Sequence, residues 1–354
     1  MEKYSWNSQP SASTPSHPVE YYQCTNNVPN SEEEPAPYTA RESRAVVLRQ
    51  DLTILPLSAF IYFLCFIDRS NIGNARILNA EKGHDMQTEI GATPYQFNIA
   101  LMVFLIGYTF FEVPSNILLK KLRPSRWLAF LMVAWGIATL ALGAVKDFAA
   151  ASGVRFLLGA SEAGLFPGLV YYLTFWYRAD ERSARAAFIL ASASLGGAFG
   201  GAIAYGIGHM DQVRGLSAWR WLFILEGLPS CLSAALVWFF LPDYPEEFYK
   251  EGTRQREVAL ARLKIEGSKR HHKTMTWQDA KATLLEWRLY LHYAIYFGVA
   301  VPFSSLALFS PTIIAGLGYK GLDSQLFTVP PYAVSYGKSQ SPRSSHERPT
   351  NAKQ

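Results

Sequence analysis

Charged residues are scarce in this sequence, and cysteines are scarcer. Aspartate, glutamate, lysine and arginine make up 17% of the 354 residues, against about a quarter in an average soluble domain. The three cysteines, at positions 24, 65 and 231, lie far apart. That number and spacing exclude a disulfide framework and a cysteine-based metal site. We therefore expect no metal and no cofactor.

The charges that are present are segregated along the chain. Most of them fall in residues 1–50, 242–288 and 338–354. The rest is apolar in blocks of about twenty residues, the length that a helix needs to cross a bilayer core about 30 Å thick. The sequence therefore predicts an all-α fold, a polytopic membrane helix bundle.

Seven apolar blocks are long enough to span a membrane. They begin near Leu52 and then cover about 94–119, 127–145, 152–177, 186–208, 219–241 and 289–316. An uncharged stretch at 324–337 would reach only about 21 Å as a helix, which is short of a bilayer core. A polar segment follows it. This pattern predicts a C-terminally truncated product or a mis-spliced gene model.

The order of these blocks predicts five regions. We expect a disordered cytoplasmic tail (1–50), a six-span N-terminal bundle (51–241), a cytoplasmic central loop (242–288), an incomplete C-terminal bundle (289–337) and a polar tail (338–354). Two short helices are expected in the loop, near 254–265 and 277–286. Six spans, a charged loop and then further spans are typical of a two-bundle carrier. Basic residues concentrate in the second-to-third and fourth-to-fifth linkers, which predicts a cytoplasmic N-terminus.

Charged residues inside the predicted spans are the candidate functional groups, because they are costly in a bilayer and usually face a cavity. Six are present: Asp68, Arg69, Glu112, Arg155, Glu162 and Glu226. Arg155 and Glu162 are seven residues apart, so they share one helix face at about 10.5 Å. A guanidinium fits a carboxylate with two hydrogen bonds. A desolvated glutamate is a suitable proton carrier.

Small residues recur at four-residue intervals in two of the spans. They are Ala160, Gly164 and Gly168 in the fourth block and Gly196, Gly197, Gly200 and Gly201 in the fifth. This spacing allows neighbouring helices to approach closely.

Several long strings carry a family resemblance. They are FIDRSNIGNA at 66–75, LLKKLRPSRW at 118–127, RFLLGASEAGLFPG at 155–168, WYRADERSAR at 176–185, WRWLFILEGLP at 219–229, LPDYPE at 241–246 and GLGYKGLDSQLFTVPPYA at 316–333. With these strings the sequence resembles the major facilitator superfamily. Within it, the sequence resembles the fungal allantoate permease-like group of anion:cation symporters.

The resemblance implies proton symport of a small organic anion by alternating access. Arg69, Arg155 and Asn71 would bind the substrate carboxylate, and Asp68 and Glu162 would carry the proton. Lys121 and Arg123 lie at the family's cytoplasmic gating motif, whose usual aspartate is missing from this stretch. Allantoate, nicotinate and pantothenate are compatible substrates.

The resemblance also implies a monomer, if full length, in the plasma membrane. The expected partners are the anion, protons and the lipid bilayer, with no nucleic acid.

Other functions remain open at this stage. A seven-helix receptor would need its N-terminus outside, contrary to the basic residues. An enzyme would need a metal or nucleophile cluster, whereas His271 and His272 have no third ligand nearby, so we expect no enzyme. The main alternative is a truncated, non-transporting fragment or pseudogene-like product of such a carrier.

Overall fold

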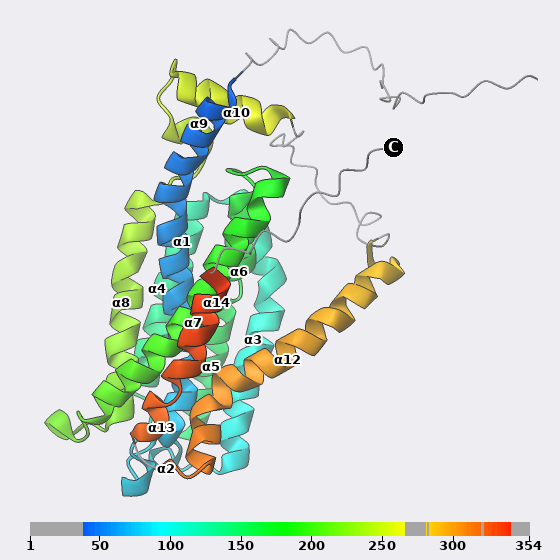
Figure 1. The fold of residues 1–354 in the computed structure, drawn as a ribbon. Coiled ribbons are helices and arrows are strands. Elements are labelled where there is room, and N and C mark those ends of the chain that lie inside the picture. The colour runs from blue at the N-terminus through cyan, green and yellow to red at the C-terminus, as the bar shows by residue number, and fades with distance from the viewer. Residues whose placement is uncertain (1–37, 266–280, 282, 320–321, 341–354) are drawn as a thin grey trace, which may run out of the picture. The chain divides into compact units, whose positions relative to one another are not determined.

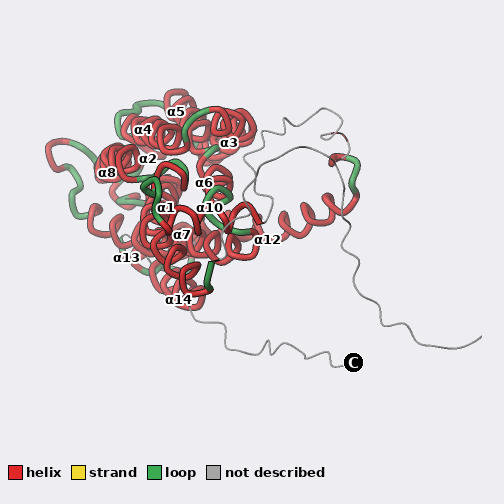
Figure 2. Tube along the Cα trace, turned by 90° about the horizontal axis from the view of Figure 1, so that it is seen from above, coloured by secondary structure: helices red, strands yellow, loops and turns green. Residues whose placement is uncertain are grey.

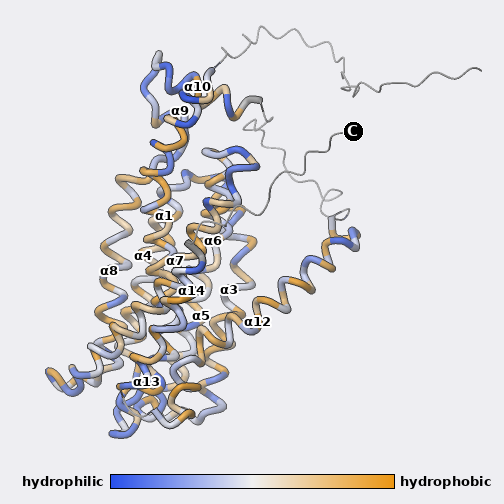
Figure 3. Tube along the Cα trace, viewed as in Figure 1, coloured by the Kyte–Doolittle hydropathy of each residue, from blue (hydrophilic) through white to orange (hydrophobic). Residues whose placement is uncertain are grey.

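The computed structural model describes residues 38–265, 281, 283–319 and 322–340, and every regular element in these ranges is a helix (Figure 1). Seven candidate spans are present: α1 (Ala40–Ile77), α3 (Pro94–Lys121), α4 (Pro124–Leu142), α5 (Phe148–Glu162) continued by α6 (Leu165–Leu173), α7 (Ala179–Gly208), α8 (Ala218–Phe240) and α12 (Trp287–Gly316). Apolar residues dominate their lengths (Figure 3). The prediction of an all-α, multi-pass membrane bundle is confirmed.

Short helices connect or follow these spans. They are η1 (Ala80–Lys82), α2 (Met86–Glu89), η2 (Val213–Gly215), α9 (Pro245–Phe248), α10 (Arg254–Ile265), α13 (Asp323–Leu326) and α14 (Val329–Gln340). The first predicted loop helix is therefore present as α10, whereas half of the second, residues 277–280 and 282, lies outside the described residues.

The first helix begins earlier than the sequence predicts. The Thr39 hydroxyl accepts a hydrogen bond from the Glu42 backbone N–H at 3.2 Å, and the Glu42 carboxylate accepts one from the Thr39 N–H at 2.7 Å. This capping box satisfies two backbone donors that a helix start leaves free. Residues 40–50 are consequently helical rather than part of a disordered tail, and residues 1–37 lie outside the described part of the chain.

The fourth predicted span is interrupted. Regular helix stops at Glu162 and resumes at Leu165, with Ala163 and Gly164 between. Pro167 has no N–H and cannot bond the carbonyl four residues earlier, that of Ala163. Gly164 also lies so close to the Ser115 side chain on α3 that a Cβ atom would overlap it. Glu162 therefore sits at the very end of a helix.

The predicted eighth span is also broken, into α13 and α14. The two helices are separated at Phe327 and Thr328. They pack against α7, where Tyr332 lies on Gly197 and Thr328 on Gly201. Small residues of α7 make this contact possible, as the spacing in the sequence predicts.

Three helix pairs form the main contacts of the bundle, α4 with α8, α3 with α5 and α1 with α7, and Figure 2 shows them nearly end-on. Glycines line the closest approaches. A Cβ atom at Gly136 on α4 would lie 2.5 Å from Cys231 Sγ on α8, and one at Gly107 on α3 would lie 2.5 Å from the Phe156 carbonyl on α5. These contacts fix the distances between the helices that carry the charged residues.

The helix α10 docks on the first turns of α1 and α7. Arg254 donates to Glu42 at 3.0 Å, and Arg262, whose side chain is 2% exposed, pairs with Glu181. Beneath them Val258 and Ala259 of α10 pack with Val46 of α1. The central loop is thus attached to the helical bundle by both charge and apolar contact.

Arg262→Gln is expected to loosen α10. It removes a hydrogen-bonded ion pair, at a cost of about 2 kcal/mol. Deuterium uptake over residues 254–265 should rise. Arg256→Gln is the matched control, because Arg256 on the same helix pairs at 3.7 Å with Glu251, whose side chain is 90% exposed. Equal exchange in both variants would mean that apolar contacts alone hold α10.

Candidate functional site

An ion pair links α1 to the end of α5. Arg69 Nη2 lies 2.9 Å from Glu162 Oε2, and Arg69 Nε donates to the same oxygen at 3.0 Å. Cys65, one turn earlier on α1, places its thiol 3.6 Å from this oxygen. The Glu162 side chain is fully buried, whereas that of Arg69 is 33% exposed. The pair can therefore be reached from the Arg69 side.

A second guanidinium lies behind this pair. Arg155 is 1% exposed and stacks on the Phe104 ring at 5.4 Å. The Arg69 guanidinium lies 5.5 Å from the same ring and 4.9 Å from the Tyr108 ring. Among the described residues Arg155 pairs with no carboxylate. The site thus contains one glutamate and two arginines, and both arginines lie against aromatic rings. Its net charge is positive, so a bound anion would neutralise it.

Asp68 and Asn71 point away from the two arginines. Asp68 accepts a hydrogen bond from Ser230 on α8 at 2.6 Å. The Asn71 amide donates to Glu226, also on α8. All four side chains are buried. The predicted site residues are therefore divided between two clusters, one between α1 and α5 and one between α1 and α8.

Several neighbours of these clusters were not singled out from the sequence. Ser230 follows Glu226 by four residues and so shares its helix face, a spacing that could have indicated it. Phe104 lies one turn before Tyr108 on α3, in a block that contains several aromatic residues. No local signal shows that the Phe104 ring lies beside both guanidinium groups and the Tyr108 ring beside that of Arg69.

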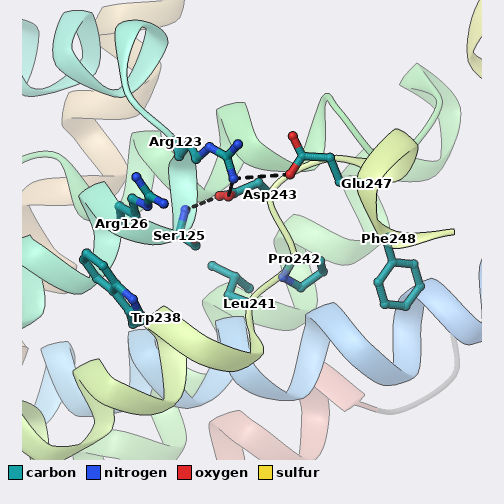
Figure 4. Close-up of a pocket in the computed structure, with 9 residues that line it drawn as sticks. All are labelled: Arg123, Ser125, Arg126, Trp238, Leu241, Pro242, Asp243, Glu247 and Phe248. Carbon is teal, nitrogen blue, oxygen red and sulfur yellow. Dashed lines mark hydrogen bonds and ion pairs between the residues drawn. The ribbon is translucent and has the colours of Figure 1, made fainter. Parts of the chain in front are cut away.

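Arg123 has carboxylate partners from a distant part of the chain (Figure 4). Its Nη1 lies 3.7 Å from Asp243 and 3.4 Å from Glu247, and Asp243 also accepts the Ser125 backbone N–H at 2.8 Å. These residues line a surface pocket of about 380 Å³. Asp243, directly after α8, supplies a carboxylate that the 118–127 string lacks, while Lys121 is exposed and forms no ion pair with a described residue.

Metal-binding side chains are not clustered in the described part of the chain, where no three His, Cys, Asp or Glu residues come together. His271 and His272 lie outside the described residues.

Curated proteins resembling this chain are named as transporters. MFS transporter prlL of Fungal sp. (strain NRRL 50135) is 62% identical over 300 residues, which cover 85% of this chain and 61% of that protein. MFS-type transporter cnsO of Penicillium expansum is 35% identical, with coverage of 82% and 57%. A protein of Agrobacterium vitis named "Putative tartrate transporter" is 32% identical, with coverage of 80% and 60%. The chain thus spans about three fifths of the length of these relatives.

The fold of a solved transporter structure and the description of one protein family also match this chain. The xylose transporter XylE from E. coli, in a partially occluded inward open conformation, matches with a TM-score of 0.56 over 81% of this chain and 68% of that chain. At 14% identity this likeness shows the fold alone. The description of the Major Facilitator Superfamily matches residues 58–338, most of the chain. The chain therefore belongs to the Major Facilitator Superfamily.

Proposed function

We propose that this chain is a secondary active carrier that moves a small organic anion together with a proton by alternating access. The observation that carries the proposal is the arrangement of Arg69, Glu162 and Arg155 between α1 and α5. Two guanidinium groups and one carboxylate, all on candidate membrane spans, carry a net positive charge that a further anion would balance. Charged groups inside a membrane protein commonly mark the path of a substrate or ion.

The ion pair suggests how the proton and the anion are coupled. While Glu162 is ionised, it occupies the Arg69 guanidinium through two contacts. A proton on Glu162 removes its charge and frees Arg69 for a carboxylate of the substrate. Arg155, whose guanidinium lies over the Phe104 ring, then supplies a second pair of hydrogen-bond donors to the substrate. Binding of the anion would then be favoured by binding of the proton, which couples the two.

The substrate class is inferred from the site and its relatives. Two arginines favour an anion with at least one carboxylate, because a guanidinium matches two carboxylate oxygens. The relative named as a tartrate transporter supports a small carboxylic acid. The family strings favour the allantoate permease-like group. We propose a small mono- or dicarboxylate as the substrate.

The proposed topology follows from the order of the apolar blocks and from the positions of the basic residues. Residues 51–241 form the N-terminal bundle, 242–288 a cytoplasmic loop, and 289–337 part of a second bundle. The N-terminus is cytoplasmic, because basic residues concentrate in the linkers on that side. The plasma membrane is the proposed location. The ion pairs of Arg123 with Asp243 and Glu247 would then connect the start of α4 to the segment after α8 on the cytoplasmic side.

Arg155→Lys is the test of the anion site. A lysine keeps the charge but loses the two-pronged contact, so affinity for the substrate should fall about tenfold or more, which corresponds to about 1.4 kcal/mol. Binding of radiolabelled tartrate, allantoate and nicotinate to the purified chain, and their uptake into proteoliposomes, are the measurements.

Arg76→Lys is the matched control for this substitution. Arg76 also stacks on an aromatic ring, that of Phe97 at 5.3 Å, but it lies in the last turn of α1. It should leave affinity unchanged. If Arg155→Lys binds each probe as tightly as the unmodified chain does, Arg155 is structural and the proposed anion site is wrong.

A further inference from the structure

Two buried acids, Asp68 on α1 and Glu226 on α8, are each hydrogen-bonded to the other acid's helix. Asp68 is 1% exposed and Glu226 is 6% exposed. Their hydrogen bonds cross between the helices: Ser230 on α8 donates to Asp68 at 2.6 Å, and Asn71 on α1 donates to Glu226. Asn71 and Ser230 each lie about one turn after the acid on their own helix. The four side chains thus form one closed polar cluster, the acid pair with its two donors.

No positive charge compensates this acid pair. Among the described residues neither carboxylate forms an ion pair, since Arg69 is engaged by Glu162. The other titratable groups that interact with the pair are Glu162 from α5, the Cys65 thiol of α1 and the Cys231 thiol of α8. The Trp135 indole of α4 lies beside Asp68, but its N–H does not come within hydrogen-bond geometry of the carboxylate. On α7, which packs on both helices, Arg185 is held by Asp51. Two ionised carboxylates in such surroundings would repel each other strongly.

The cluster also contains acceptors that lack a donor. Asp68 Oδ1, Glu226 Oε1 and Asn71 Oδ1 are buried, and none of them receives a hydrogen bond from a described residue. Asn71 is fully buried, and an unpaired buried acceptor of this kind is costly. An additional proton would turn one carboxylate oxygen into a donor. It would relieve both the repulsion and the missing hydrogen bond.

We propose that Asp68 and Glu226 form one proton-binding site, with Asn71 and Ser230 as its hydrogen-bond partners, separate from the Arg69–Glu162 pair. A proton fits better than a metal cation, because Ser230 and Asn71 already donate to the two carboxylates and direct their hydrogens at them. A proton needs only one free oxygen. A role of this site in coupling rests on the proposed proton symport. Proton binding by the acid pair does not depend on that proposal.

Infrared spectroscopy of the purified chain in lipid nanodiscs tests the site without transport. A protonated carboxylic acid has a carbonyl stretch that an ionised carboxylate lacks, and its intensity is followed across a pH titration. The unmodified chain should show this band, and the double variant Asp68→Asn with Glu226→Gln should lose the component that the pair contributes, seen in the difference between the two spectra. Glu226→Gln alone should bind the remaining proton at least tenfold more weakly, because the second negative charge is gone.

Controls separate this result from misfolding and from other acids. Glu112→Gln removes another intramembrane carboxyl, on α3, and should leave the titration unchanged. Elution in gel filtration and the thermal midpoint show whether each variant is folded. The proposal is overturned if Glu226→Gln leaves the band and its titration as in the unmodified chain. It is also overturned if radioactive sodium binds and the double variant abolishes that binding while no protonated band is present.

The infrared titration tests the acid pair, and uptake driven by a pH gradient tests proton symport, so the two proposals can fail separately. If the band titrates as expected but no pH gradient drives uptake, the proton site stands and proton symport fails. If the acid pair contributes no such band while a pH gradient still drives uptake, symport stands through another group such as Glu162, and the acid pair is not a proton-binding site.

Discussion

Glu162→Gln is expected to abolish accumulation of substrate against its gradient while exchange of internal for external substrate continues. Glutamine resembles the protonated acid in shape and charge, so Arg69 would be permanently free for the anion. The carrier would then bind substrate at any pH without carrying a proton. For one coupled proton, a gradient of two pH units can support about hundredfold accumulation, and in this variant the ratio should fall to about one.

The pH dependence of binding gives the same prediction in a second form. In the unmodified chain the anion competes with ionised Glu162 for Arg69. Affinity should therefore fall about tenfold per pH unit once Glu162 is ionised in the free carrier. In Glu162→Gln the affinity should be independent of pH over this range. Binding of a labelled carboxylate to the purified chain, measured from acidic to alkaline pH, provides the comparison.

The control for this prediction is again Glu112→Gln. Glu112 lies on α3 and has no hydrogen bond or ion pair with a described residue in the structure, so its replacement should leave both accumulation and pH dependence intact. Uphill uptake by Glu162→Gln at the level of the unmodified chain would remove Glu162 from the coupling step. The Arg69–Glu162 contact would then be purely structural.

Gly159→Ala is expected to destabilise the protein strongly, although it adds only a methyl group. A Cβ atom at Gly159 on α5 would overlap the Phe104 carbonyl oxygen on α3 and lie 3.0 Å from its carbon and 3.1 Å from the Tyr108 nitrogen. These are backbone atoms, so no side-chain rotation relieves the clash. Overpacking of this kind costs about 3 kcal/mol. The thermal midpoint in nanodiscs, followed by tryptophan fluorescence, should fall.

Gly153 provides the matched control on the same helix. It is exposed, and no atom outside its own helix lies within 4 Å of a Cβ built there. Gly153→Ala should leave the midpoint unchanged or raise it slightly, since alanine favours a helix over glycine. A loss of stability as large in Gly153→Ala would indicate that α5 tolerates no added methyl group anywhere. The close approach of α3 and α5 would then not explain the effect at Gly159.

The helices of this protein were predictable because the bilayer imposes their length. The apolar blocks locate six of the seven candidate spans to within about seven residues at either end, the exception being the early start of α1. The helix α10 begins where its pattern predicts and is described as far as Ile265. The interruption at Ala163 was harder to predict. It depends on Pro167, which has no N–H, and on the close contact of Gly164 with Ser115. The early start of α1 depends on the Thr39 and Glu42 cap, which occurs within an otherwise polar segment.

The candidate site was predictable as a list of charges but not as an arrangement. Helical spacing places Arg155 and Glu162 on one face. It does not show that Arg69, from another helix, contacts Glu162 while its neighbour Asp68 turns to α8. That division depends on the rotation of α1 against two partners at once. Asp243 is similarly far from Arg123 in the sequence, and only the fold brings the two together.

The adjacency of Asp68 and Arg69 on α1 has a thermodynamic consequence. One rigid helix presents one residue to the acid pair and the next to the anion site, so a rotation of α1 disturbs both sets of contacts. If protonation strengthens anion binding by some factor, the anion must strengthen proton binding by that same factor. Saturating substrate should therefore change the buffering capacity of the purified protein, even where nothing crosses a membrane.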